Sequence, residues 1–452
     1  MRAKLLWVVM GGRTGGYLGG SGRVLPVAAL FLAVLLLTGC APKAPTNDLE
    51  LSRFLKLKEN QARALTLQSD SKMPAEVWSL FEYLQRDKWS ESSNAFVRLQ
   101  GRSGRSGAPI PPSPLQTVVD TITQAGQTLG LSQPKASALQ DSPWHTLVDA
   151  YWAYFVSKTW RREPLDMVTH GIQTTIPAGA IFFGDSDVGR FAISRAMESQ
   201  APDKRFSVIT QNQLADYSYW DYARFLCGTN ITMPSSDDFN TVYSRYVAGA
   251  YGTGRVAVVA MNAEFSQLIY EQNPSRRIYI EASWFFPEWA YPRALPRGLV
   301  FEVSRWPVTQ LKENALANDR EFWSGVCKQL LGDEIRRETS VGELCEFVEK
   351  IYLRMDMTDF KGDRKYVSDR VAQDWFGMAR QAAAALYQWR CVHGEQVEEK
   401  QRMLDESLFA YKQTLALCPM TSMDFAGLLS QIGRTNEATR ILSVRERIAA
   451  RR

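Results

Sequence analysis

The sequence has few of the residue types and spacings that most enzyme classes require. It contains only three histidines (His145, His170 and His393), which lie far apart and show no metal-ligand spacing. None of its six cysteines forms a CxxC pair, and the chain has no Gly-x-Ser-x-Gly elbow, Walker loop or catalytic Cys-His arrangement. We therefore expect no metal and no cofactor.

The net charge of the chain is close to zero once its N-terminal residues are left out. The formal charge is +5, but residues 1–39 contain four basic residues and no acidic one. The remaining chain has 49 basic and 48 acidic residues, an excess too small for binding along a nucleic acid. We expect no nucleic-acid partner.

No apolar run is long enough to cross a bilayer as a helix. The stretch VLPVAALFLAVLLLTGC ends at Cys40, and its apolar core of about 15 residues is short of the ~20 needed for a span but typical of a signal peptide. Leu37-Thr38-Gly39-Cys40 resembles a bacterial lipobox. This resemblance implies a lipoprotein signal peptide over 1–39, acylation (palmitate) at Cys40, and a membrane anchor on the periplasmic side of the envelope.

Two details qualify this interpretation of the N-terminus. Ala41 stands where the inner-membrane retention signal of some bacteria has Asp, which favours the outer membrane. A short membrane anchor with an incidental cysteine is the alternative.

An odd number of cysteines is left after Cys40. We expect mostly buried thiols on helices, with at most one disulfide. They are Cys227, Cys327, Cys345, Cys391 and Cys418.

The chain before residue 115 is predicted to be helical and then flexible. Apolar residues at helical spacing predict a helix from Leu49 to Leu67 and two shorter helices within 74–100. The stretch GRSGRSGAPIPPSP (101–114) predicts a linker. We therefore separate an N-terminal helical segment (40–100) from a central domain.

Residues 115–307 are predicted to form that central α/β domain. Short apolar runs alternate with helical patterns, which favours a mostly parallel sheet with helices on its faces. The uninterrupted run Ala257–Ala260 fits a strand buried on both sides. The predicted strands are AIFF, RFSVIT, RVAVVAMN, RRIYIEA and GLVFEV.

Residues 308–452 are predicted to be helical. The segments 411–419 and 424–442 resemble parts of tetratricopeptide repeats (TPR), although ordinary helical hairpins share these features. Two partial units are fewer than the three or so that a free solenoid needs. We therefore expect this TPR-like region to pack on the central domain.

Polar and aromatic residues follow the predicted strands at their carboxyl ends, where open parallel sheets bind ligands. After the first strand comes Gly184-Asp185-Ser186-Asp187-Val188-Gly189-Arg190, and after the third comes Met261-Asn262-Ala263-Glu264. We expect the leading candidates to line one open cleft. The candidate ligand-binding residues are Asp187, Arg190, Gln211, Asn212, Asp216, Glu281 and Trp289.

The loop after the first strand allows two interpretations. Asp185 and Asp187 could share a hard cation or serve glycosyl chemistry. Alternatively, Asp and Ser cap the following helix and Arg190 pairs with an acid. We favour capping and pairing, and two negative charges disfavour a phosphate loop.

Two further features leave alternatives open. The aromatic stretch ADYSYWDYARF (215–225) could stack on sugars, but its rings cannot all point one way on a helix, so at least half are expected in the core. Glu281 and Glu288 could form an acid/base pair, although the sequence does not set their separation.

Several blocks together resemble a group of bacterial exported proteins labelled as TPR proteins, over roughly residues 74–445. The blocks are GAIFFGDSDVGRF, VITQNQLADYSYWDYAR, FPEWAYPRALPRGLVFEV, FKGDRKYV, LALCP and GRTNEA. The first two are also similar to the soluble end of membrane proteins grouped with protein O-mannosyltransferases. The resemblance implies an extracytoplasmic accessory or binding domain without catalytic residues, and Asp185 looks like a departure from the group's loop.

These observations favour a lipid-anchored periplasmic binding or scaffold protein without catalytic activity. Its partner would be a protein or an envelope glycan. The alternative is a glycan-modifying enzyme or accessory subunit that uses Asp187, with Arg190 and Asn212 orienting the substrate.

Overall fold

The computed structural model describes residues 49–68, 73, 75–103, 142–252, 254–283, 286–332 and 335–451. The predicted signal peptide, Cys40 and most of the predicted linker lie outside these residues. The first three linker residues, 101–103, belong to the end of a helix instead.

A five-stranded sheet forms the centre of the molecule, with its strands in the order β2-β1-β3-β5-β4. β1 is parallel to β2 and β3, whereas β5 is antiparallel to both β3 and β4. The expectation of a mostly parallel sheet is therefore wrong, and the sheet is mixed. The strands are β1 (Ile181–Gly184), β2 (Ser207–Thr210), β3 (Ile278–Glu281), β4 (Ala294–Arg297) and β5 (Val300–Val303).

A tight hairpin explains the antiparallel half of the sheet. β4 and β5 are joined by two residues, and Gly298 there has φ 68°, a conformation that favours glycine in short hairpin turns. β4 was not predicted, because its sequence ALPR contains a proline and lacks an apolar run. Its position at the sheet edge is one where a proline is tolerated.

The predicted strand around Ala257–Ala260 is wrong, because these residues lie in helix α12 (Gly254–Gln272). The buried residues Val258, Met261, Phe265 and Ile269 recur every three or four positions, as on one face of a helix. The sequence has no glycine or proline between 255 and 272 that would end the helix. A short apolar run cannot by itself distinguish a buried strand from a buried helix.

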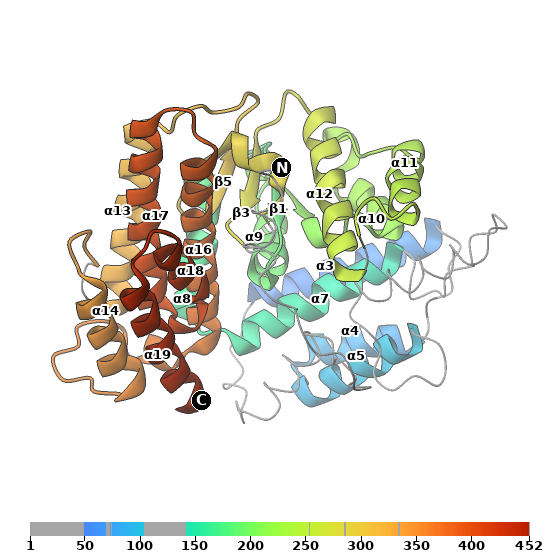
Figure 1. Ribbon diagram of the computed structural model, residues 1–452. Coiled ribbons are helices and arrows are strands. Elements are labelled where there is room, and N and C mark those ends of the chain that lie inside the picture. The colour runs from blue at the N-terminus through green and yellow to red at the C-terminus, as the bar shows by residue number, and fades with distance from the viewer. Residues whose placement is uncertain are drawn as a thin grey trace, which may run out of the picture.

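Helices cover both sides of the sheet. Figure 1 shows α13, α16 and α17 on one side and α10, α11 and α12 on the other. The remaining central elements are α8 (Arg162–Thr175), the π-helix η1 (Val188–Ala192), α9 (Ile193–Glu198), η2 (Pro202–Lys204), η3 (Gln211–Gln213), α10 (Tyr217–Cys227), η4 (Gly228–Asn230), α11 (Ser236–Val247) and η5 (Glu288–Arg293).

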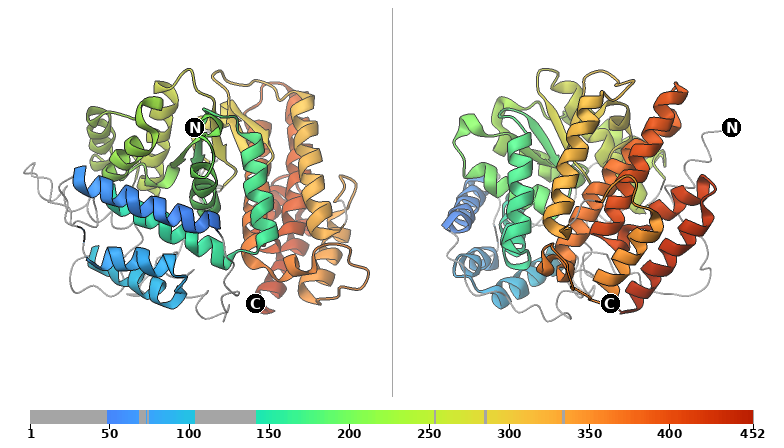
Figure 2. Two further views of the ribbon diagram at one scale, coloured as in Figure 1. Left: turned by 180° about the vertical axis from the view of Figure 1, so that it is seen from behind. Right: turned by 90° about the vertical axis from the view of Figure 1, so that its left-hand side faces the viewer.

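Four helices form a layer next to the central sheet: α3 (Leu49–Gln68), α4 (Ala75–Gln85), α5 (Trp89–Ser103) and α7 (Ser142–Thr159). Figure 2 shows α3 beside α7, with α4 and α5 on the outer side of this pair. Their buried side chains form a hydrophobic cluster of their own, which also includes Phe191 of η1. α7 therefore joins the N-terminal helices to the central part, although the sequence assigned it to the central domain alone.

The C-terminal helices share one hydrophobic cluster with the sheet, extending from Leu65 to Ile448. α16 and α17 have 24 and 21 residues, whereas α18 and α19 have 9 and 17. Because the two helical hairpins differ in length, the prediction of a TPR-like repeat is not confirmed. The helices are α13 (Glu313–Leu331), α14 (Val341–Val348), η6 (Glu349–Leu353), α15 (Arg364–Ser368), α16 (Arg370–His393), α17 (Val397–Leu417), η7 (Pro419–Thr421), α18 (Met423–Gln431) and α19 (Thr435–Arg451).

The five cysteines that follow Cys40 keep their thiols, and no disulfide joins any two of them. Cys391 is half-buried and the other four are buried. Within the described ranges, no helix combines the length and apolarity required to cross a bilayer.

Candidate functional site

The loop between β1 and η1, residues 184–190, lies at the switch point of the sheet. From β1 the chain passes to β2 on one side and later to β3 on the other. Gly184 is in register with Thr210, and Phe183 with Ile280, so the carboxyl ends of three parallel strands meet here. This is the position at which open α/β sheets bind ligands.

Glu281, the last residue of β3, binds this loop through hydrogen bonds. Its Oε2 accepts the backbone N–H groups of Asp185 (2.7 Å) and Ser186 (2.8 Å), and its Oε1 accepts the Ser186 hydroxyl. The Glu281 side chain is fully buried. It therefore does not line an open cleft. Glu288 is exposed on η5, so the two carboxyl groups do not form an acid/base pair that a substrate could reach from solvent.

The two glycines of the loop are required by this close packing. A Cβ at Gly189 would lie 2.0 Å from Glu281 Oε2, and one at Gly184 would lie 2.5 Å from the Gly189 carbonyl oxygen. Real Cβ atoms do not approach other atoms so closely, so only glycine fits either position without moving the loop.

Ser186, rather than an aspartate, caps the start of the helical segment. Its Oγ accepts the Gly189 N–H at 3.0 Å, whereas Asp187 makes no capping hydrogen bond. The same oxygen accepts the indole N–H of Trp375 from α16 at 3.0 Å. One hydroxyl thus makes three hydrogen bonds, its full capacity, and it joins β3, η1 and the C-terminal helices.

Asp187, Arg190 and Asn212 are brought together as predicted. Arg190 donates to Asp187 Oδ1 at 3.0 Å and to Asn212 Oδ1 at 2.6 Å. The Arg190 side chain is 14% exposed and that of Asp187 is 44% exposed. Of these three residues, Asp187 therefore offers a carboxylate to solvent, while the guanidinium is largely held inside.

Asp185 points inward. Only 7% of the residue is exposed, and its Oδ1 has no hydrogen-bond partner among the described residues. Burial raises the pKa of Asp185 to about 7 from an ordinary 3.8; the charge of Glu281 adds to this rise and Arg190 opposes it. A carboxyl group that titrates near neutrality at a sheet switch point is a candidate for acid/base chemistry.

The other predicted site residues serve local structure. Asp216 caps α10 by accepting the Ser218 N–H at 3.0 Å. Gln211 is buried in η3. Trp289 donates to Ser266 of α12 and lies against Tyr270. The Tyr270 hydroxyl donates to the backbone carbonyls just after β5, beside the start of β3 and so at the opposite end of the strands from the loop.

The aromatic stretch 215–225 is a core element rather than a sugar platform. Tyr219, Trp220 and Tyr222 are buried, and Tyr217 and Phe225 are partly buried against the main hydrophobic cluster. The prediction that at least half of these aromatic side chains lie in the core is confirmed.

Two residues that support the site were not predicted as such. Trp375 contacts Ser186 across 189 positions of sequence, and no local pattern indicates this contact. Asn262 was expected to follow a strand, yet it reaches the β2 exit from the side of α12, accepting the Ala215 N–H at 2.7 Å and donating to the Asn212 carbonyl at 3.3 Å.

A second polar cluster lies between the N-terminal helices and the central part. Lys58 of α3 is fully buried and lies 2.6 Å from Glu198 and 3.1 Å from Asp149. Burial acts to lower the pKa of Lys58, but the two carboxylates outweigh it and the pKa is raised. Tyr222 accepts from Lys58 at 2.8 Å and donates to Asp149, so the cluster is closed by its own groups and has a structural role.

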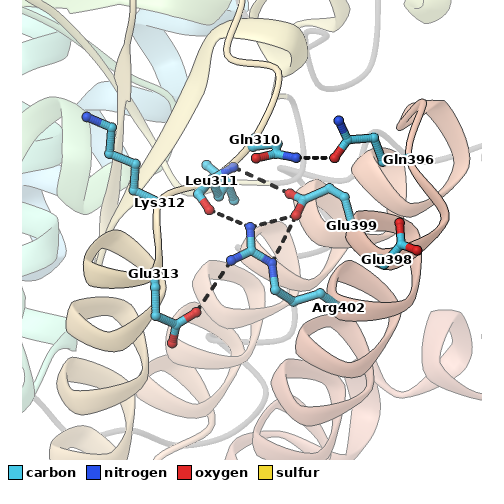
Figure 3. A pocket seen from close by; sticks show the side chains of 8 residues that line it. All are labelled: Gln310, Leu311, Lys312, Glu313, Gln396, Glu398, Glu399 and Arg402. Carbon is cyan, nitrogen blue, oxygen red and sulfur yellow. Dashed lines mark hydrogen bonds and ion pairs between the residues drawn. The ribbon is translucent and has the colours of Figure 1, made fainter.

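A pocket of about 350 Å³ lies elsewhere, between the start of α13 and the start of α17. Figure 3 shows Arg402 between Glu399 and Glu313, with its guanidinium also donating to the Leu311 carbonyl at 2.5 Å. Gln310 is bonded to Gln396 across the mouth. These groups satisfy one another and join the starts of α13 and α17, while the exposed Lys312 and Glu398 complete the charged lining.

In the described part of the chain, no three acidic, histidine or cysteine side chains are placed to hold a metal ion. Comparison of the chain with models of known protein families, with curated proteins and with solved structures finds no match in any of the three. The family resemblance of the sequence blocks remains a prediction, and the loop at the switch point is the basis for proposing a function.

Proposed function

We propose that this protein is anchored by lipid at Cys40 to the periplasmic side of a bacterial membrane, with the outer membrane favoured, and binds a partner protein or an envelope glycan without catalysing a reaction. The lipobox-like Leu37-Thr38-Gly39-Cys40 and the length of the apolar run before it support the anchor. The C-terminal helical hairpins, TPR-like in sequence, would offer a second contact surface.

One observation carries the binding proposal: the loop is built rigidly but presents a carboxylate. The Asp187 side chain is 44% exposed, while Arg190 beneath it is fixed by two hydrogen bonds. Glu281 has its oxygens occupied by the loop itself. A rigid loop with one accessible charged group suits recognition, because little conformational entropy is lost on binding.

The test places a photo-reactive residue at Ser194 in the living cell, a partly exposed position on α9 in the helical segment that follows the loop, so the Asp187 carboxylate is kept. We expect covalent adducts whose mass distinguishes a protein from a glycan, and their loss when Asp187→Asn is added. The matched control adds Asp203→Asn instead, at an exposed carboxylate on η2, and should keep the adducts. Adducts of equal yield with Asp187→Asn, or no adducts at all, contradict the proposal.

The free energy of unfolding of Asp187→Ala shows whether this variant is still folded. Because Asp187 makes no helix cap and its ion pair with Arg190 is half-exposed, Asp187→Ala should cost no more than about 1 kcal/mol. A binding defect in this variant is then a defect of recognition and not of folding.

The raised pKa of Asp185 favours a second candidate, a glycan-modifying activity in which the loop moves to bring this inward-pointing acid to a substrate, with which it exchanges a proton. Its pKa of about 7 suits that role. Asp185→Asn would then abolish sugar release or transfer from envelope glycan while the protein stays folded. Turnover that survives in this variant excludes Asp185 as the acid.

A further inference from the structure

Two buried carboxyl groups belong to the loop and its contact with β3. Asp185 is 7% exposed and Glu281 is fully buried. The backbone N–H of Asp185 donates to Glu281 Oε2 at 2.7 Å, and the charge of Glu281 raises the pKa of the Asp185 carboxyl group. Two ionised carboxylates are not stable in such a place without matching cations, so one of them retains a proton.

The hydrogen bonds favour Asp185 as the carboxyl group that keeps the proton. Burial raises the pKa of both groups, but Glu281 accepts two backbone N–H groups and one hydroxyl, and these bonds oppose the effect of burial on it. Asp185 Oδ1 accepts no hydrogen bond from the described residues, and a hydrogen bond with Ser283 opposes the effect of burial on Asp185 only in part. The nearby cation, Arg190, is already bound to Asp187 and Asn212.

Among the described residues, no further compensating charge acts on Asp185. β3 contributes Glu281, the segment just after it contributes Ser283, and α16 and the exit of β2 contribute uncharged side chains to the loop. The charged groups that act on Asp185 are Glu281, Arg190 and Asp187, and the uncharged ones around the loop are Ser283, Trp375 and Asn212.

We propose that Asp185 keeps a proton beside Glu281 while the loop is closed, and that loss of this proton to solvent releases the loop 185–190 from β3. When both groups are ionised, their repulsion opposes the contact that holds the loop. Moving Asp185 into water relieves this repulsion. The loop is thereby a pH-dependent latch that carries Asp187 and Arg190.

The burial of Asp185 sets the range of pH over which the loop opens. Burial, with the charge of Glu281, raises the pKa of Asp185 to about 7 in the closed loop, whereas the opened loop returns it toward its ordinary value. The opening equilibrium therefore rises about tenfold per pH unit between these values and levels off above the higher one. The latch does not depend on what the loop binds, but the binding proposed above uses the closed loop and should weaken as the loop opens.

Hydrogen exchange at the amides of Asp185 and Ser186 tests the latch, because both donate to Glu281. After correction for intrinsic exchange, we expect their protection to fall about tenfold per pH unit as the pH approaches 7, then to level off. In Asp185→Asn, a neutral isostere of the protonated acid, protection should not vary with pH. Asp203→Asn, at an exposed carboxyl on η2, should behave as the wild type.

A second measurement identifies the proton itself. Between about pH 5.5 and pH 6.5, where ordinary carboxyl groups are ionised, the infrared carbonyl band of a protonated carboxyl group should be present in the wild type and absent from Asp185→Asn, and the wild-type band should disappear well above neutrality. Loop protection that is independent of pH in the wild type overturns the proposal. So does a pH-dependent loss of protection that persists in Asp185→Asn.

Discussion

Asp185→Asn should stabilise the protein, and the gain should depend on pH. A buried acid whose pKa is about 7 in the folded state and 3.8 otherwise binds its proton more tightly when folded. Below about pH 4 the acid is protonated in both states and costs nothing. Between about pH 4 and pH 7 the unfolded chain loses the proton first, so the free energy of unfolding falls as the pH rises.

The size of the effect follows from the two pKa values. Each pKa unit corresponds to about 1.4 kcal/mol, so the penalty reaches about 4 kcal/mol above pH 7 if the loop stays closed. If the loop opens locally, the penalty is limited to the smaller free energy of opening. Asparagine has no proton to lose, so the variant avoids the penalty.

Urea unfolding of wild type and Asp185→Asn from about pH 4 to about pH 8.5 measures this difference. We expect curves of free energy that meet at the acidic end and separate by up to about 4 kcal/mol at the basic end. Titrating groups that do not interact with Asp185 are common to both proteins and cancel, whereas Glu281 is coupled to Asp185 and its titration changes with the substitution. A separation that does not change with pH refutes the reasoning, because it shows that Asp185 has an ordinary pKa.

Two further substitutions test the packing around the loop and the N-terminal helices by denaturant unfolding. Gly189→Ala should cost about 1–3 kcal/mol or more, because its Cβ would lie 2.0 Å from a buried carboxylate oxygen; unchanged stability would show that the loop is not held on β3. Lys58→Met should cost about 3–5 kcal/mol, because it leaves two carboxylates without their buried cation; a loss under about 1 kcal/mol would contradict the closed cluster. The matched controls at exposed positions are Gly325→Ala, with open space around it and a gain of about 1 kcal/mol expected, and Lys56→Met, with a change within about 0.5 kcal/mol.

Local pattern was sufficient to predict the parallel strands and most helices. β1, β2 and β3 are short apolar runs bounded by polar turns, and they lie where the sequence predicts them. Their order and the reversal of β5 depend on which edge each strand joins. That choice is made by contacts distant in sequence, so a pattern of strands and helices predicts a parallel sheet by default.

The errors have the same origin. α12 is buried on the face that carries Val258 and Met261 and continues without a breaker, so its first turns look like a buried strand in a short window. β4 stands at an edge with only one neighbour, β5, and needs no strong strand pattern to pair.

The position of the candidate site was predictable, and its internal roles were not. The sequence places Asp187, Arg190 and Asn212 at the carboxyl ends of neighbouring strands, and the structure brings them together. The sequence does not show which of Asp185 and Asp187 turns inward. That depends on Glu281, whose carboxylate fills the space beneath the loop and leaves Asp185 buried beside it.

The hydrophobic cluster that extends from Leu65 to Ile448 affects how the chain acquires its structure. β1 pairs with β3 across about a hundred residues, and α13, α16 and α17, which cover one side of the sheet, follow all five strands in the chain. The central sheet therefore cannot bury that side until these later helices have been synthesised, and contacts of this separation slow folding.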